Sequence, residues 1–381
     1  MSETFAVIAG GGTGGHVIPA IAIARALVDR GHPRDSIHFV GSRRGIEGRL
    51  VPAAGFPITV LPGRGLVRGM APANLAAASG IIVAVIRAVA LLGRLRPSVV
   101  VSVGGYASVP CTVAASVWRI PLVVAEQNAV PGAANRLAGK VAVAAATSFP
   151  GTALPRATLT GNPVRAEVLA VDRRPSGRAA ARAELGLPAE GAVIAVVTGS
   201  LGSRRVNRAV VELAERWADR PGVAINHVIG ERDWAELGAR GAPQPGLQPV
   251  EQPGQPAGLF YRKVRFEERM DLLYASADVA VGRAGATSVA ELAVVGLPAV
   301  LVPLPGAPGD HQTRNARNME AAGAAVVVPD RECDAQRLGA ELDALLGDPV
   351  ALVRMGEAAR RAAHPGAADA VATLVEKHSR G

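Results

Sequence analysis

The stretch "AVIAGGGTGGHVIPA" (residues 6–20) decides the fold, because it is typical of a buried strand that runs through a glycine-rich turn into a helix. Gly10, Gly12 and Gly15 fit the G-x-G-x-x-G spacing, which brings backbone N–H groups and the positive end of a helix close to a phosphate. The spacing fits a dinucleotide cofactor, and it fits other phosphorylated ligands as well. His16, directly after the turn, is the first sign that the ligand is not a nicotinamide cofactor.

Outward from this turn, short runs rich in valine and isoleucine alternate with helical stretches along the chain. Strands that alternate with helices form parallel sheets with right-handed crossovers, so the sequence predicts two tandem Rossmann-like α/β domains that divide near Pro163. Residues 241–258, rich in Pro, Gly and Gln, are predicted to form a surface insertion. The predicted strands are residues 5–10, 36–41, 57–61, 98–105, 121–128 and 141–145 in the first series, and 192–200, 223–230, 263–266, 277–282, 298–304 and 324–328 in the second.

The composition is that of a folded protein with more than one domain. A chain of 381 residues is too long to form one ordinary hydrophobic core. Because 49% of the residues are apolar and only 19% are charged, the composition excludes a disordered chain. The two cysteines, Cys111 and Cys333, exclude a disulfide framework, and the N-terminus lacks the basic lead of a signal peptide, so a reduced, cytoplasmic setting is predicted. The formal net charge of +9 favours anionic partners, but no nucleic-acid-binding motif accompanies it, and we expect no nucleic acid as a partner.

The stretch "LAAASGIIVAVIRAVALL" (residues 75–92) is the most apolar part of the chain that has helical spacing. Arg87 interrupts it and it is barely long enough to cross a bilayer, so it is predicted to be an amphipathic helix. Arginines surround its apolar face, which favours shallow docking of residues 64–96 on an anionic membrane surface. The alternative is that this face packs on the protein's own sheet.

Two further glycine turns bear on the choice of ligand. The second predicted strand ends in "FVGSRRG", where an NAD site would place an acidic residue, although arginines suit NADP. The turns "SVGGY" (102–106) and "TGSLGSRRVN" (198–207) follow other strands, one in each half of the chain. Three such turns fit two phosphorylated ligands better than one nicotinamide cofactor, and an NADP-dependent oxidoreductase stays open as an alternative.

Polar side chains also gather after the strands of the second half. In "GRAGATSVAELAVVGLPAVLVPLPGAPGDHQTRNA" (282–316), Thr287 begins a helix, Glu291 follows one turn later, and a loop leads to His311 and Gln312. Carboxylate and amide groups are what the hydroxyls of a ribose or hexose need. His16 lies at a helix N-terminus, where the dipole disfavours the imidazolium, so its neutral ring is a candidate base or, equally, a capping or ligand-orienting group.

Six motifs, in order along the chain, resemble those of the MurG family of peptidoglycan glycosyltransferases. They are "GGGTGGHVIPA", "SVGGYASVP", "AEQNAVPG", "TGNPVR", "GSLGSRRVN" and "GRAGATSVAELAVVGLPAVLVPL…DHQTRNA". The resemblance implies the GT-B fold, in which two Rossmann-like domains face a cleft. It implies an acceptor- and membrane-facing domain over residues 1–164, a UDP-GlcNAc-binding domain over 165–346, and C-terminal helices over 347–381 that cross back to the first domain.

The activity that this resemblance implies is an inverting transfer of N-acetylglucosamine. The donor would be UDP-GlcNAc, and the acceptor would be the C4 hydroxyl of undecaprenyl-pyrophosphoryl-MurNAc-pentapeptide, at the cytoplasmic face of the cell membrane. The resemblance implies a peripheral membrane enzyme that needs neither a cofactor nor a metal, and the sequence has no Asp-x-Asp pair of the kind that metal-dependent sugar transferases use.

The family's site residues carry over onto matching positions. His16 is the candidate base, and Leu201 departs from the usual glutamine of the family. The positions assigned to the acceptor's pyrophosphate side are Thr13, Gly14, Gly15, Gly104, Gly105 and Tyr106. Those assigned to the donor are Asn128, Arg165, Ser200, Phe266, Met270, Ala286, Thr287, Glu291, His311 and Gln312.

Two alternatives keep the fold and change the chemistry. One is a GT-B enzyme that glycosylates a soluble aglycone, which the motifs "EQNAVPG" and "GNPVR" disfavour. The other is a UDP-GlcNAc 2-epimerase, which would act on UDP-GlcNAc without any acceptor. A non-catalytic partner protein is disfavoured because the site residues are in place.

Overall fold

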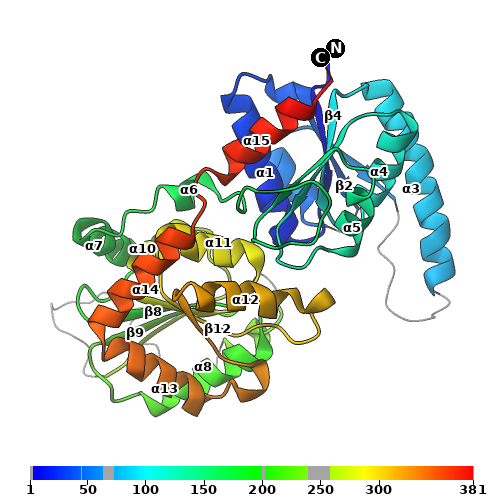
Figure 1. The fold of residues 1–381 in the computed structure, drawn as a ribbon. Helices are drawn as coiled ribbons and strands as arrows, with labels where there is room; N and C mark the ends of the chain where they lie inside the picture. The colour runs from blue at the N-terminus through cyan, green and yellow to red at the C-terminus, as the bar shows by residue number, and fades with distance from the viewer. Residues whose placement is uncertain (1–2, 44, 63–72, 200–201, 239–257, 381) are drawn as a thin grey trace. The chain divides into compact units, whose positions relative to one another are not determined.

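The computed structural model describes residues 3–43, 45–62, 73–199, 202–238 and 258–380. Its backbone contacts divide the chain into two compact units, which we call unit 1 (Met1–Arg165 with His364–Gly381) and unit 2 (Ala166–Ala363). This division splits the predicted C-terminal segment 347–381 at residue 364, since only its last part groups with unit 1. Figure 1 shows both units as α/β domains.

Unit 1 is built on a seven-stranded parallel sheet with the order β3-β2-β1-β4-β5-β6-β7. The central strands are almost continuous runs of buried Val, Ile and Ala, because a parallel sheet is covered on both faces. The edge strand β7 was missed from the sequence because its three residues are all exposed and carry no apolar run. The strands are β1 (Ala6–Gly10), β2 (Ile37–Ser42), β3 (Ile58–Leu61), β4 (Val99–Gly104), β5 (Leu122–Glu126), β6 (Ala144–Thr147) and β7 (Ala157–Leu159).

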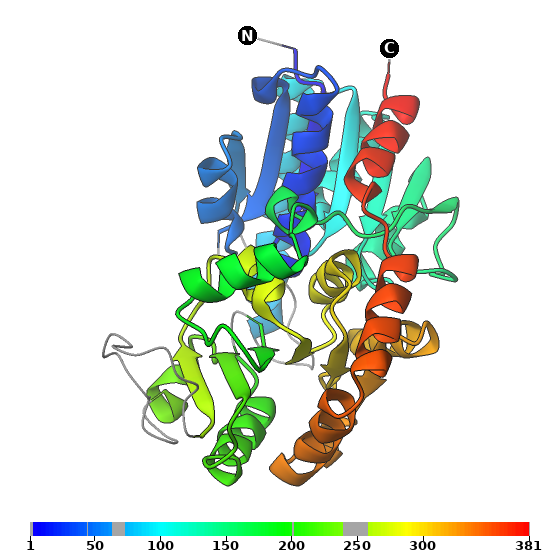
Figure 2. The same ribbon diagram turned by 90° about the vertical axis from the view of Figure 1, so that its left-hand side faces the viewer.

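Helices cover both faces of this sheet. On one face, Ile23 and Leu27 of α1 pack in the same core as Val371 and Val375 of α15, and Figures 1 and 2 both draw α15 beside α1. On the other face, α3 and α4 pack against each other and the sheet. The helices of unit 1 are α1 (Gly14–Asp29), α2 (Glu47–Ala53), α3 (Ala73–Leu95), α4 (Ser108–Val117), α5 (Ala133–Gly139) and α15 (Ala367–His378), with a 3₁₀ turn η1 (Arg34–Ser36).

Unit 2 contains a six-stranded parallel sheet with the order β10-β9-β8-β11-β12-β13. Its core joins Val210 and Leu213 of α8 to Leu338 and Leu342 of α13. The strands are β8 (Ala192–Val197), β9 (Val223–Val228), β10 (Phe260–Val264), β11 (Val279–Gly282), β12 (Ala299–Leu301) and β13 (Ala325–Val327). The helices are α6 (Ala166–Leu169), α7 (Pro175–Glu184), α8 (Arg204–Arg216), α9 (Trp234–Leu237), α10 (Met270–Ser276), α11 (Ala286–Val295), α12 (His311–Ala321), α13 (Ala335–Leu346) and α14 (Pro349–Ala362), with the 3₁₀ turns η2 (Pro308–Asp310) and η3 (Asp330–Glu332).

Each sheet has a point where the order of its strands reverses. In unit 1 the reversal lies between β1 and β4, and in unit 2 it lies between β8 and β11. Ligands of open α/β sheets bind outside the carboxyl ends of the strands at such a point. The glycine turns of the sequence follow β1, β4 and β8, so they stand where each unit is expected to bind a ligand, and the predicted pair of Rossmann-like domains is confirmed.

Candidate functional site

Two glycine turns of unit 1 touch each other at the carboxyl ends of β1 and β4. The backbone N–H of Gly11 donates to the carbonyl oxygen of Gly104 over 3.2 Å. Gly105 has a φ of +84°, and a Cβ atom there would clash with the carbonyl oxygen of Gly11. The first glycine loop, which continues into α1 at Gly14 and Gly15, therefore contacts the second turn through Gly11.

His16 lies in the first turn of α1, beside the second glycine turn. Its Nδ1 is 3.2 Å from the hydroxyl oxygen of Thr13, the N-cap residue, whose side chain caps no backbone N–H group. A Cβ atom on Gly104 would lie 3.2 Å from both Cδ2 and Nε2 of His16, so the ring packs directly against this glycine. The structure thus brings Thr13, His16 and Gly104 together at the strand-order reversal of unit 1.

A buried carboxylate fixes the first glycine loop. Glu47, 2% exposed, begins α2 and accepts the backbone N–H of Gly12 at 2.8 Å through Oε2. Its other oxygen accepts the backbone N–H of Ser42 at 2.7 Å and the Ser42 hydroxyl at 2.8 Å. Sequence reasoning missed Glu47, because only the pairing of β1 with β2 brings Ser42 and Gly12 to the same carboxylate.

A second buried carboxylate orients the predicted sugar ligand Asn128. Glu126, at the end of β5, accepts the backbone N–H of Asn128 at 2.9 Å through Oε1, and its Oε2 accepts the side-chain amide of Asn135 at 2.9 Å. Asn135 in turn accepts the hydroxyl of Ser102, which lies on β4. Sequence reasoning named Asn128 and missed Glu126, although a carboxylate in the apolar run "PLVVAEQN" was a visible signal.

Tyr106 and Arg165 are the two remaining predicted residues of unit 1. The hydroxyl of Tyr106 donates to the carbonyl oxygen of Pro62 at 3.0 Å, and burial raises the pKa of this phenol. Tyr106 therefore ties the second glycine turn to the segment that follows β3. Arg165, predicted as a donor ligand, is the last residue of the first stretch of unit 1 and is half-buried.

In unit 2, the helix that follows β11 holds a buried carboxylate. Glu291 of α11 is 3% exposed and accepts the hydroxyl of Tyr274 at 2.9 Å through Oε2. One turn earlier lie Ala286, which is buried, and Thr287, whose hydroxyl is buried without a hydrogen-bond partner among the described residues. Glu291 is therefore not a solvated helix residue, and its fixed carboxylate lies at the strand-order reversal.

The loop after β12 brings the next pair of predicted residues to the start of α12. His311 Nδ1 is 2.9 Å from the carbonyl oxygen of Pro308, and the amide oxygen of Gln312 accepts the backbone N–H of Leu304 at 3.0 Å. Asn315, which sequence reasoning missed, donates to the carbonyl oxygen of Ala284 at 3.1 Å. Asn315 thus ties α12 to the loop after β11.

The predicted uracil-side residues lie near the sheet edge, after β10. Phe266 is 54% exposed, and Met270 is half-buried at the start of α10. Three predictions fall outside the described residues: Ser200, the part of the membrane segment over 64–72, and the insertion over 241–257. Within the described part of the chain, no cluster of His, Cys, Asp or Glu side chains is suited to hold a metal ion.

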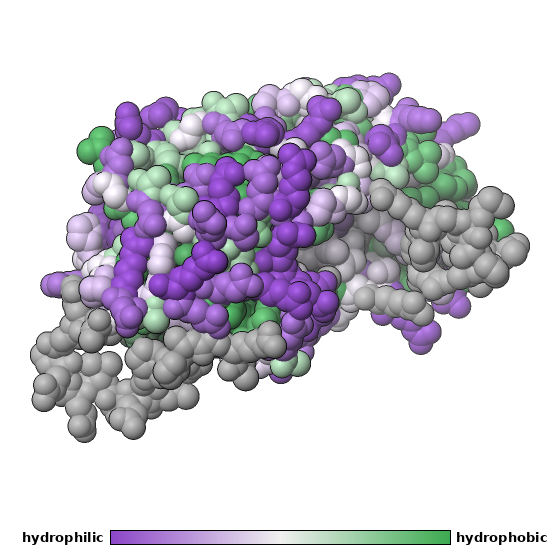
Figure 3. Space-filling model, turned by 90° about the horizontal axis from the view of Figure 1, so that it is seen from below, coloured by the Kyte–Doolittle hydropathy of each residue, from purple (hydrophilic) through white to green (hydrophobic). Residues whose placement is uncertain are grey.

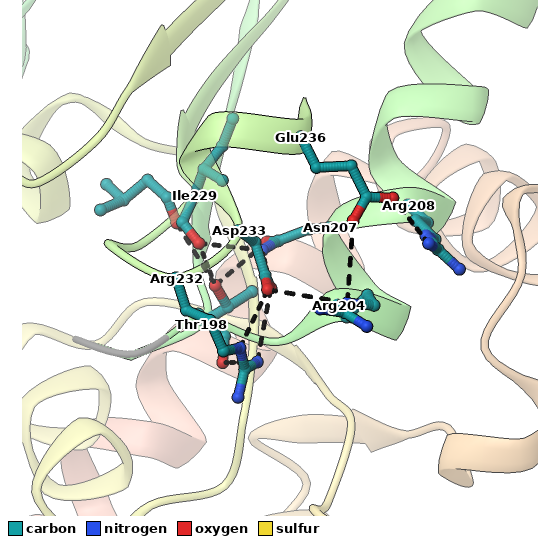
Figure 4. Close-up of polar contacts among 10 residues, drawn as sticks. Thr198, Arg204, Asn207, Arg208, Ile229, Arg232, Asp233 and Glu236 are labelled. Atoms are coloured by element: carbon teal, nitrogen blue, oxygen red, sulfur yellow. Dashed lines mark hydrogen bonds and ion pairs between the residues drawn. The ribbon is translucent and has the colours of Figure 1, made fainter. Parts of the chain in front are cut away.

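A buried polar network anchors the glycine turn that follows β8, and Figure 4 shows it around Asn207 and Asp233. Asn207 accepts the hydroxyl of Thr198 at 3.1 Å, and its side-chain amide donates to Asp233 at 2.9 Å and to the carbonyl oxygen of Ile229 at 2.8 Å. These bonds join the end of β8, the start of α8 and the loop after β9, so they fix the turn from three sides.

His227 extends this network into the core. Its Nε2 is 3.0 Å from Oδ1 of Asn207, and its Nδ1 is 2.8 Å from the hydroxyl of Tyr261. Because the amide oxygen can only accept, Nε2 carries the proton and Nδ1 accepts from Tyr261, which defines a neutral ring. Burial, and then the nearby charge of Lys263, lowers the pKa of His227 to about 3.

This buried histidine predicts that unit 2 loses stability in acid. The unfolded chain binds a proton near the usual pKa of 6.5, whereas folded His227 does not until about pH 3. Between these values the unfolded state holds more protons, so the free energy of unfolding falls as the pH falls, by about 1.4 kcal/mol per pH unit at most. In His227→Gln, which keeps a donor and an acceptor, denaturant titrations from pH 6 to 4 are expected to show a shallower dependence. An unchanged slope would assign the acid sensitivity to other groups.

Comparison with known proteins gives two family matches. Residues 6–147 match the glycosyltransferase family 28 N-terminal domain, and residues 193–372 match the glycosyltransferase family 28 C-terminal domain. The curated relatives that match most of the chain are named UDP-N-acetylglucosamine–N-acetylmuramyl-(pentapeptide) pyrophosphoryl-undecaprenol N-acetylglucosamine transferase, and two of them serve as examples. The one from Desulforudis audaxviator is 38% identical and the match covers 97% of each chain. The one from Alkalilimnicola ehrlichii is 40% identical, with 98% of this chain and 99% of the relative covered.

Solved structures agree in fold. MurG of Acinetobacter baumannii is 30% identical and superposes with a TM-score of 0.74, over 98% of this chain and 99% of that one. A UDP-N-acetylglucosamine 2-epimerase from Listeria monocytogenes, 14% identical, has a TM-score of 0.67 over 99% of this chain and 97% of that one. At that identity the second likeness concerns the fold alone.

Proposed function

The chain belongs to the MurG family of N-acetylglucosaminyltransferases, and on that premise we propose that unit 1 binds the lipid-linked acceptor and unit 2 binds UDP-GlcNAc. The protein is a glycosyltransferase of the GT-B fold that acts in peptidoglycan synthesis. It transfers N-acetylglucosamine to the muramyl-pentapeptide carried on undecaprenyl pyrophosphate. The observation that carries this conclusion is an identity of 38–40% to transferases of this name over nearly the whole chain.

The donor assignment rests on the fixed polar groups of unit 2. The Glu291 carboxylate, buried and held by Tyr274, is suited to accept the hydroxyls of a ribose, and Ala286 and Thr287 at the start of α11 offer a helix N-terminus to a phosphate. The ring of His311 and the side-chain amide of Gln312 are each held by a hydrogen bond with a backbone group, so both are suited to bind hexose hydroxyls. Exposed Phe266 and half-buried Met270 are the proposed border of the uracil.

The acceptor assignment rests on the touching glycine turns of unit 1. The bond between these turns uses the N–H group of Gly11 and the carbonyl oxygen of Gly104. The backbone N–H groups at the start of α1 are therefore not used by that bond, and a helix N-terminus of this kind suits the acceptor's pyrophosphate. We assign His16 as the base that takes the proton of the C4 hydroxyl at Nε2 as that oxygen attacks C1 of the sugar and UDP departs with inversion. In this role the Nδ1–H of His16 donates to the Thr13 hydroxyl, which orients the ring.

A further part of the proposal is peripheral docking on the cytoplasmic face of an anionic membrane. None of the described helices is long and apolar enough to cross a bilayer. One side of α3 packs inward through Ala84, Ala88 and Leu92, whereas Ile82 and Ile86 are 62% and 63% exposed. In Figure 3, hydrophobic residues gather on the right-hand side of the view, where Figure 1 draws α3. An exposed apolar ridge that carries Arg87 and Arg94 fits shallow insertion beside anionic headgroups.

Replacing Ile82 and Ile86 together by aspartate is expected to abolish co-sedimentation with vesicles of anionic phospholipid at low salt. Two carboxylates on this ridge oppose both apolar insertion and attraction to anionic lipid. Val350→Asp is the matched control, because Val350 is 66% exposed on α14 of unit 2. Activity on a short-chain, water-soluble acceptor is expected to survive in all variants. Unchanged vesicle binding by the double variant would place the membrane contact elsewhere.

The deciding experiment measures UDP release from UDP-GlcNAc by the purified protein, with and without a short-chain lipid-linked muramyl-pentapeptide. Release that requires the acceptor and is unaffected by a chelator is expected of the proposed reaction. Turnover of the donor without any acceptor would indicate an epimerase or a hydrolase instead. An absence of turnover with both substrates would contradict the proposed reaction.

A further inference from the structure

An arginine from a neighbouring loop lies against the glycine turn of unit 2. Arg232 follows β9, the strand beside β8 in the sheet, and its Nη2 donates to the carbonyl oxygen of Gly202 at 3.1 Å. Gly202 has a φ of +80°, and a Cβ atom there would lie 2.5 Å from the carbonyl oxygen of Ile229. The turn and the loop after β9 are therefore in close backbone contact, and the guanidinium lies along their junction.

A buried carboxylate holds this guanidinium in place. The side chain of Asp233 is fully buried, and its Oδ1 accepts Nε of Arg232 at 3.0 Å while its Oδ2 accepts the amide of Asn207 at 2.9 Å. Asp233 is thereby anchored to the same network that fixes the turn (Figure 4). The side chain of Arg232 is nevertheless 52% exposed, and its Nη1 has no hydrogen-bond partner among the described residues. One edge of the guanidinium is thus fixed and the other remains available to a ligand.

Two other arginines, Arg204 and Arg208, lie in the same cluster of charged side chains around Asp233 and Glu236, and they are held differently. Arg204 lies 3.9 Å from both Asp233 and Glu236, and Arg208 pairs with Glu236 at 2.6 Å. A second polar group at the turn lacks a partner: Ser203, the N-cap residue of α8, is 4% exposed and its hydroxyl has no hydrogen-bond partner within the described residues. The start of α8 therefore combines a helix N-terminus, an unpartnered buried hydroxyl and a fixed cation.

We propose that Arg232 binds the diphosphate of the nucleotide donor and of the departing UDP, with Asp233 as the residue that positions it. A helix N-terminus and an arginine together are a strong site for phosphate oxygens, and Arg232 is held in place before the ligand arrives. Because negative charge grows on the diphosphate as the sugar leaves, such a cation stabilises the transition state more than the bound donor. This inference rests on the proposed donor site in unit 2. It adds to that site a phosphate-binding residue, Arg232, which lies outside all of the sequence motifs.

The test compares Arg232→Ala with Arg208→Ala, whose arginine is also 52% exposed in the same cluster but pairs with Glu236. Binding of UDP is measured by calorimetry, and binding of uridine, which has no phosphate, by ligand-observed NMR. Arg232→Ala is expected to weaken UDP binding about tenfold or more and to leave uridine binding unchanged, as follows from losing one charge-assisted hydrogen bond. Arg208→Ala is expected to change neither. Arg232→Lys is expected to recover part of the UDP affinity. Lysine keeps the positive charge, but its single amino group cannot be held by Asp233 at two nitrogens as the guanidinium is.

Two results would overturn the assignment. Equal weakening of UDP and uridine by Arg232→Ala would mean that the residue only supports the fold of the loop, and unchanged UDP binding would mean that it does not touch the diphosphate. Failure of the wild-type protein to bind UDP would instead contradict the proposed donor site itself. Thermal unfolding of each variant, recorded alongside, separates loss of fold from loss of binding.

Discussion

Replacing His16 by alanine is expected to lower kcat by about 10²–10⁴-fold, the range that a well-placed general base contributes. The ring lies at the strand-order reversal of unit 1, where it packs against Gly104. The KM for UDP-GlcNAc is expected to change little, since the proposed donor residues, apart from Asn128 and Arg165, lie in unit 2. The measurement is acceptor-dependent UDP release at saturating concentrations of both substrates.

Thr13→Val provides the matched comparison for this prediction. It keeps the imidazole and removes the hydroxyl that lies 3.2 Å from Nδ1, so the ring loses its orientation but not its basic nitrogen. We expect a smaller loss of kcat than in His16→Ala. A near-normal kcat in His16→Ala would rule out the role as base and leave His16 as a group that orients the acceptor.

Gly105→Ala is expected to destabilise unit 1 and to disturb the contact between its two glycine turns. A left-handed φ costs a non-glycine residue about 1–2 kcal/mol, and here the new Cβ would also clash with the Gly11 carbonyl oxygen. Since that oxygen is backbone, the clash is relieved only if the two glycine turns separate. The expected results are a lowered unfolding temperature and a strong loss of kcat/KM for the acceptor, measured by thermal unfolding and by UDP release.

Gly151→Ala separates strain from packing in this prediction. Gly151 is also left-handed, with a φ of +71°, but a Cβ atom there would meet nothing within 4 Å. Its alanine variant is therefore expected to show the backbone cost alone and to keep its activity on the acceptor. Equal losses in both variants would show that the contact between the two glycine turns has no special importance.

The sequence predicted those features that depend on neighbouring residues. The turn after β1 and the alternation of strands and helices are local patterns of apolar and glycine residues, and they match the observed sheets. The sequence did not reveal the buried groups that hold these turns. Glu47 acts through the pairing of β1 with β2, and His227 reaches Asn207 only because it lies beside Val196 in the pairing of β8 with β9. Such contacts depend on the order and register of strands, which no spacing within one motif specifies.

The resemblance to a family supplied what local pattern reasoning lacked, and it also left gaps. It assigned roles to Asn128 and Glu291 but not to Glu126 and Tyr274, the groups that hold them. Asp233 and Arg232 fall outside every quoted motif, so neither periodicity nor resemblance pointed to them. Arg232 reaches Gly202 because β9 lies beside β8 in the sheet, and no motif within one stretch of sequence specifies that contact.

The packing of α15 in unit 1 has a consequence for the order in which a ribosome can complete the two units. Val371 and Val375 lie in one core with Ile23 and Leu27, which are made more than three hundred residues earlier. Unit 2 is contiguous in sequence, so a nascent chain can close its core before translation ends. The sheet of unit 1 must instead wait, with part of one apolar face uncovered, until α15 has left the exit tunnel. During synthesis, the first unit to begin is therefore the last to be finished, and its uncovered face is where chaperones would be needed.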